Sequence, residues 1–263
     1  MNLDFLCYPI GMLVKLLYNM VSVLDTTILS AYAISIILAT LAFKLVLMPL
    51  TLKQTKSMKK MQDLNPKIKE LQEKYGKDPQ TLQRKQMELY KEANYNPMSG
   101  CLPMLIQMPI LIAFFYVIQQ PLKFVFQDQA FFDAMNKSFL WIKDLGFAEN
   151  HLFVPGDLSS VNGLGMFGAS LPFIGAAVPI LAAVSGYSTY LTSKMTAASQ
   201  PSMSEQQETT QKTMTMMMPV MLFVFSIQFP AGLALYWVVS NLFQVAQQYL
   251  ILNSSKKSKE ELK

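Results

Sequence analysis

The stretch from Thr26 to Leu52 constrains this chain most, because it is apolar and long enough to cross a lipid bilayer. Lys44 is the only charged residue in the stretch. A cation inside a spanning helix costs about 2.5–3.5 kcal/mol on insertion scales, so it usually faces protein or water. Lys44 lies roughly 10 Å from the Thr51 end at about 1.5 Å per residue. Its side chain either snorkels to the interface or projects into a wet, positively charged cavity, and this helix alone favours neither.

The overall composition agrees with a membrane protein. Hydrophobic residues make up 52% of the 263 residues and charged residues only 15%, which is too little charge for the surface of a soluble protein of this size. We therefore predict an all-α, polytopic membrane protein.

Cofactor motifs are weak or missing in the sequence. The single histidine, His151, makes a histidine-based zinc site improbable. Gly163, Gly165 and Gly168 have the spacing of a dinucleotide-binding loop but lie in no strand-and-helix context. We expect no cofactor, no metal and no catalytic residue, so the chain is not read as an enzyme.

Long uncharged runs predict five transmembrane helices. The run from Thr213 to Ser255 contains 43 uncharged residues, about twice one spanning length, with a natural break at Phe229–Gly232. The predicted spans are residues 26–52, 102–122, 171–193, 213–229 and 231–252.

The polar segments between the spans have distinct patterns. Residues 1–25 predict an interfacial amphipathic helix, with an atypical signal or anchor segment as the alternative. Residues 53–97 predict an antiparallel helical hairpin, because apolar residues recur every three or four positions on both sides of a turn at Gly76–Pro79. Residues 123–170 predict an interfacial loop rich in aromatic residues, residues 194–212 a linker, and residues 253–263 a basic tail.

Charge sets the expected orientation. The hairpin, the linker and the tail lie on one side of the membrane and hold 17 of the 22 Lys and Arg residues. The positive-inside rule therefore predicts a cytoplasmic C-terminus and an extracytoplasmic N-terminus.

Polar residues in the other spans favour a shared site with Lys44. Trp237, Asn241, Gln244 and Gln248 are spaced to lie on one face of the last helix. The other polar candidates are Gln107 in the second span, and Ser185, Tyr187, Thr189, Thr192 and Ser193 in the third. Ordinary hydrogen bonds between helices are the simpler interpretation. So many polar groups beside one cation favour a hydrophilic cavity.

The sequence contains the motifs FKLVLMPLTLKQTKSMKKMQ, NPMSGCLPMLIQMPILIAFFY and MTMMMPVMLFVFSIQFPAGLALYWVVSNLFQVAQQYLI, of which the second and the last are long and specific. These motifs resemble the YidC/Oxa/Alb family of membrane-protein insertases, in the compact form found in Gram-positive bacteria. The resemblance implies a five-helix core with a cytoplasmic hairpin and a groove that carries a positive residue, usually arginine, at the position of Lys44. Gln107 and Trp237 match groove positions of the family, whereas Thr192 and Ser193 stand where relatives often have glutamine.

The resemblance also implies function and partners. The chain would insert nascent membrane proteins into the bacterial plasma membrane, especially small proteins with acidic extracytoplasmic tails. Expected partners are the Sec translocon, the ribosome, signal recognition components and membrane lipids, with no specific nucleic-acid sequence. The rival hypothesis is an anion channel or small-solute transporter, because an intramembrane lysine among polar groups also fits an anion path. The internal repeats common in transporters are not visible in the sequence.

Overall fold

The computed structural model describes residues 3–96, 102–147, 180–197 and 205–260. These residues form helices and, within the described ranges, pair only in isolated β-bridges rather than in strands. The all-α prediction is thus confirmed. Two helices, Asp4–Leu24 and Ala31–Tyr75, are long and apolar enough to cross a membrane by length and composition. The five-span arrangement stays a prediction.

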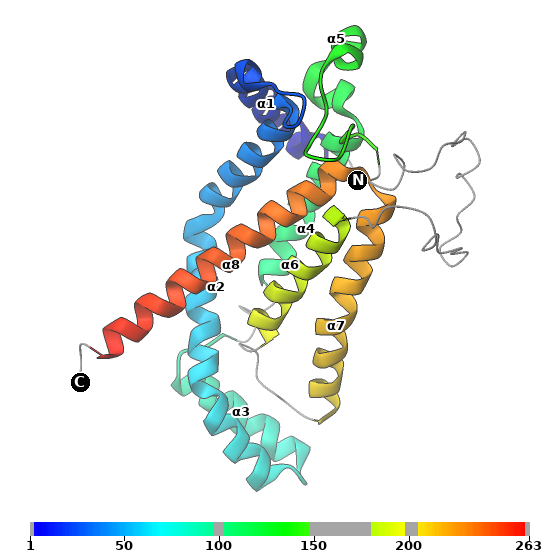
Figure 1. The fold of residues 1–263 in the computed structure, drawn as a ribbon. Coiled ribbons are helices and arrows are strands. Elements are labelled where there is room, and N and C mark those ends of the chain that lie inside the picture. The colour runs from blue at the N-terminus through cyan, green and yellow to red at the C-terminus, as the bar shows by residue number, and fades with distance from the viewer. Residues whose placement is uncertain (1–2, 97–101, 148–179, 198–204, 261–263) are drawn as a thin grey trace.

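Helix α1, Asp4–Val21, lies at one end of the bundle, followed by the short turn η1, Ser22–Leu24 (Figure 1). Its buried residues recur every three or four positions, as expected for one helical face, and pack on α2, α4 and η3. The opposite face is also apolar but exposed, with Phe5, Met12, Leu16 and Met20 among its residues. One apolar face thus packs on the protein, while the other is free to meet lipid.

Helix α2, Ala31–Tyr75, joins the first predicted span to the first arm of the hairpin. The Ser30 side chain caps its start by accepting a hydrogen bond from the Ala33 amide at 3.1 Å. The helix does not end at Leu52, where the predicted span ends, because the segment that follows is also helical and Pro49 does not end the helix. One continuous helix therefore carries both Lys44 and the first arm of the hairpin.

Helix α3, Pro79–Glu92, folds back along α2 at the end of the molecule opposite α1 (Figure 1). Met61, Leu64, Ile68 and Tyr90 form the buried seam between the two helices. Gln86, which interrupts the apolar pattern of α3, is buried in the same hairpin.

Helix α4, Leu102–Gln119, leads into the π-helical turn η3, Leu122–Phe126, and the short helix α5, Gln129–Ala134. The chain after α5 ties the outer ends of two helices together. Ser138 accepts a hydrogen bond from the Ser30 amide at 3.0 Å, and Leu145 accepts one from the Gly232 amide at 2.9 Å. The starts of α2 and α8 are thereby held by one loop.

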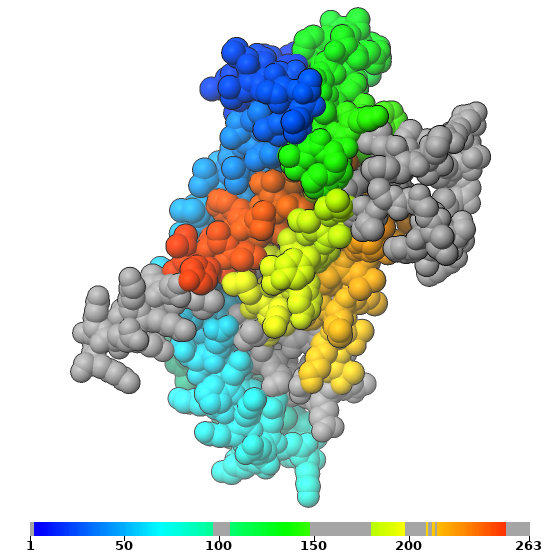
Figure 2. Space-filling model, viewed as in Figure 1, coloured from blue at the N-terminus to red at the C-terminus, as the bar shows by residue number. Residues whose placement is uncertain are grey.

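The remaining helices are α6, Ile180–Ala197, α7, Glu205–Gln228, and α8, Ala231–Glu260. The start of the third predicted span and the motif at Gly163–Gly168 lie outside the described residues. Helix α7 begins earlier than the expected residue 213, and α8 continues beyond residue 252. Helix α8 packs on both α2 and α6, and it lies between them in Figures 1 and 2.

Candidate intramembrane polar site

Lys44 lies on the buried side of α2, with 9% of its surface exposed. Its Nζ donates a hydrogen bond to Gln107 Oε1 on α4 at 3.4 Å. This is longer than the usual 2.9–3.0 Å of an N–H···O bond, so the ammonium is held loosely. Its partner is a neutral amide rather than a carboxylate.

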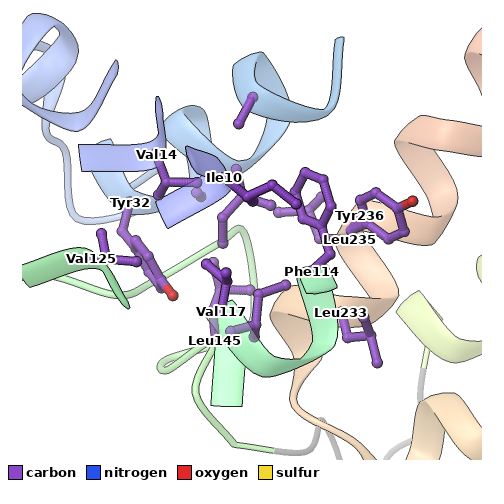
Figure 3. Close-up of a cluster of buried hydrophobic side chains, with 14 of the residues drawn as sticks. Ile10, Val14, Tyr32, Phe114, Val117, Val125, Leu145, Leu233, Leu235 and Tyr236 are labelled. Atoms are coloured by element: carbon purple, nitrogen blue, oxygen red, sulfur yellow. The ribbon is translucent and has the colours of Figure 1, made fainter. Parts of the chain in front are cut away.

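Gln107 connects Lys44 to a third helix. Its Nε2 donates to the hydroxyl of Tyr236 on α8 at 2.7 Å. Tyr236 is 2% exposed, and its ring stacks on Phe114 of α4 with centroids 4.3 Å apart and planes at 23°. Figure 3 shows these two rings side by side in the apolar core. Lys44, Gln107 and Tyr236 therefore form one polar chain through three helices, which we call the Lys44 chain.

A second polar cluster joins α6, α7 and α8. Asn241, 8% exposed, donates from Nδ2 to Ser188 Oγ at 3.1 Å and to Thr189 Oγ1 at 2.8 Å. One turn away, Ser226 of α7 donates to Ser185 of α6 at 3.1 Å. We call this group the Asn241 cluster.

The two groups use different faces of α8. Tyr236 and Asn241 are five positions apart, which turns their side chains by about 140° in an α-helix. Tyr236, Ser240 and Gln247 share the face toward α2 and α4, and Gln247 Nε2 donates to Thr51 Oγ1 of α2 at 2.6 Å. Asn241 faces α6. The structure thus separates the single polar group expected from the sequence into two.

The other candidate residues lie around these groups. Thr192 is buried on the same face of α6 as Ser185, Ser188 and Thr189, and donates to the Thr189 carbonyl at 2.9 Å. Trp237, Ser193 and Gln244 are half-buried. Tyr187 is 64% exposed because its position in the helix turns it away from that buried face, so the structure does not bring it together with the others.

Sequence reasoning missed Tyr236, Ser240 and Gln247. Their spacing of four and seven residues puts them on one helical face, so a signal was present. The neighbouring series of Trp237, Asn241, Gln244 and Gln248 contains more side-chain amides, and the prediction was based on that series instead.

The fold and this site define an α-helical membrane protein with a buried cation between its helices. Residues 23–259 match the family model described as the 60Kd inner membrane protein, and the chain belongs to that family, which includes the YidC membrane-protein insertases. It is thus a bacterial plasma-membrane protein. The family predicted from the sequence motifs is confirmed.

The chain is 38% identical to the membrane protein insertase YidC of Clostridium perfringens over 253 residues, 95% of this chain and 92% of that protein. It is 37% identical to a YidC insertase of Listeria monocytogenes over 88% of this chain and 67% of that one. A crystal structure of an active YidC insertase with its first transmembrane domain resolved matches with a TM-score of 0.59 and 26% identity. That match covers 95% of this chain and 47% of the solved one.

Proposed function

We propose that this chain transfers nascent membrane proteins from the cytosol into the plasma membrane and that Lys44 receives the acidic part of the substrate. The observation that carries this is the pairing of a buried ammonium with a neutral amide through a long hydrogen bond. The sequence contains no Asp or Glu between residues 26 and 62, 93 and 127, or 209 and 259. The predicted spans near Lys44 thus supply no carboxylate to pair with it.

An incoming carboxylate would be a better partner for Lys44 than Gln107. Hydrogen bonds between two ionised groups are shorter and roughly twice as strong as neutral ones, and a low dielectric strengthens them further. A substrate tail carrying Asp or Glu would displace Gln107 and recover part of its own desolvation cost. No covalent bond changes, so the protein would act as a catalyst of transfer.

The orientation of the chain is part of the proposal. With the hairpin of α2 and α3 in the cytosol, Lys44 is reached from the side on which the substrate is made. The exposed lysines of the hairpin are suited to contact the ribosome, signal recognition components or the Sec translocon. Anionic lipid headgroups are the other candidate partner of this basic surface.

The test is insertion into vesicles that contain the purified protein and no other translocation component. The substrate is a single-span protein with an acidic translocated tail, and its control carries Asn and Gln in place of the tail carboxylates. We expect Lys44→Ala to lower insertion of the acidic substrate about 10-fold, because one charge-assisted hydrogen bond is lost, and Lys44→Arg to retain it.

The control substrate should respond much less to Lys44→Ala. Wild-type activity of Lys44→Ala on the acidic substrate would refute the charge role. Lys44-dependent anion flux without insertion would support the channel hypothesis instead.

A further inference from the structure

Tyr236 is the least exposed member of the Lys44 chain, and no role follows for it from the pairing of Lys44 with a substrate. It lies in the core between α4 and α8 (Figure 3). Its hydroxyl contacts Gln107 at 2.7 Å, which is much shorter than the 3.4 Å between Gln107 and Lys44. The firm contact of Gln107 is therefore with Tyr236.

The chemistry of the three groups fixes which way the amide of Gln107 points. An ammonium has three donors and no acceptor, so only the oxygen of Gln107 can face Lys44. The amide nitrogen must then face Tyr236, whose hydroxyl oxygen can accept its hydrogen. If the amide turned over, its NH₂ group would face the ammonium and two donors would oppose each other.

The tyrosine hydroxyl is itself held in place. Its ring stacks on Phe114, and Ser240, one turn further along α8, lies on the same helical face as Tyr236. Ser240 is buried as well. Packing between α4 and α8 thus holds the Tyr236 hydroxyl, which in turn orients Gln107.

We infer that Tyr236 is a positioning residue, which acts on substrate through Gln107 by keeping the amide oxygen turned toward Lys44. This inference rests on the proposed function, because the position of Lys44 matters only if Lys44 receives the acidic part of the substrate. Without the hydroxyl, Gln107 can rotate away, and the buried ammonium loses its fixed acceptor. The lysine then moves toward the interface, where it is a poorer partner for a carboxylate deep in the protein.

The experiment is a double-mutant cycle between Tyr236→Phe and Gln107→Met in the vesicle assay. Phenylalanine keeps the stacked ring and removes only the hydroxyl, while methionine keeps the length of the glutamine and removes its hydrogen bonds. We expect Tyr236→Phe to slow insertion of the acidic substrate about 5-fold, the size expected for one neutral hydrogen bond. In the Gln107→Met background the same change should have no further effect, because Tyr236 acts through Gln107.

The substrate with neutral tail residues and the control variant Tyr249→Phe separate positioning from stability. Tyr249 is 62% exposed on the same helix, so loss of its hydroxyl should leave insertion unchanged. A merely structural role of Tyr236 would slow both substrates equally, and additive effects with Gln107→Met would show action by another route. Either result overturns the inference.

The Lys44→Ala variant in the same assay tells the two hypotheses apart. If it inserts the acidic substrate like the wild type, the proposed role of Lys44 fails, and the role of Tyr236 fails with it. If it is impaired while Tyr236→Phe is not, only the role of Tyr236 fails.

Discussion

Gly11 occupies a point where two backbones meet. A Cβ at this position would collide with the carbonyl oxygen of Phe124 and lie 2.7 Å from its carbonyl carbon. The neighbour is backbone of η3, which cannot rotate away as a side chain can. The sequence showed a glycine in a helix, but only the packing of α1 on η3 explains it.

We expect Gly11→Ala to lower the stability of the folded protein by about 2 kcal/mol, within the range for overpacked cores. The measurement is thermal unfolding of the purified protein in detergent. Leu16→Ala, on the exposed face of the same helix, is the matched control and should shift Tm much less. Equal shifts for both variants would mean that the close approach of α1 to η3 is not maintained.

The hairpin shows how far local sequence determines an element. The turn at Gly76, Pro79 at the start of α3 and the apolar spacing predicted an antiparallel pair of helices, and each is a local signal. Packing inside the seam was less predictable. Gln86 Nε2 and the Tyr90 hydroxyl are buried without a hydrogen-bond partner, and burial raises the pKa of Tyr90 to about 12. Unpaired polar atoms make this a weak seam.

The start of α3 gives a prediction about pH. Asp78 caps this helix by accepting a hydrogen bond from the Thr81 amide at 3.1 Å, and bonds from Thr81 lower the pKa of its carboxyl. A lowered pKa in the folded state means that the stabilisation is complete at neutral pH and is lost as pH falls through the acidic range of Asp, below about 4.

Hydrogen exchange at the Thr81 amide measures the cap, after correction for the intrinsic pH dependence of exchange. Protection should fall between pH 6 and pH 3 in the wild type. Asp78→Asn should keep protection that does not change over this range, because asparagine caps without titrating. In Asp78→Ala the Thr81 amide should exchange faster at every pH in this range. Wild-type protection that does not change with pH would contradict the role of the carboxylate.

For the whole molecule, the distribution of charge makes a prediction about topology. Lys69 lies on the hairpin and Lys143 in the chain after α5, at opposite ends of the bundle, and both are exposed. With Cys7 and Cys101 replaced by alanine, a cysteine at 69 should react with an impermeant thiol reagent only from the cytosolic side. A cysteine at 143 should react only from outside. The reverse pattern, or labelling of both from one side, would refute the proposed orientation.

The sequence by itself determined the class of protein, the depth of Lys44 in an apolar helix, the hairpin and the family. These follow from hydrophobic length, charge placement and local turn chemistry, which act within one element at a time. Only the tertiary structure decided that Lys44 meets Gln107 and Tyr236, while Asn241 turns to Ser188 and Thr189. The physical reason is that helical periodicity shows which residues share a face, but packing decides which neighbour that face meets.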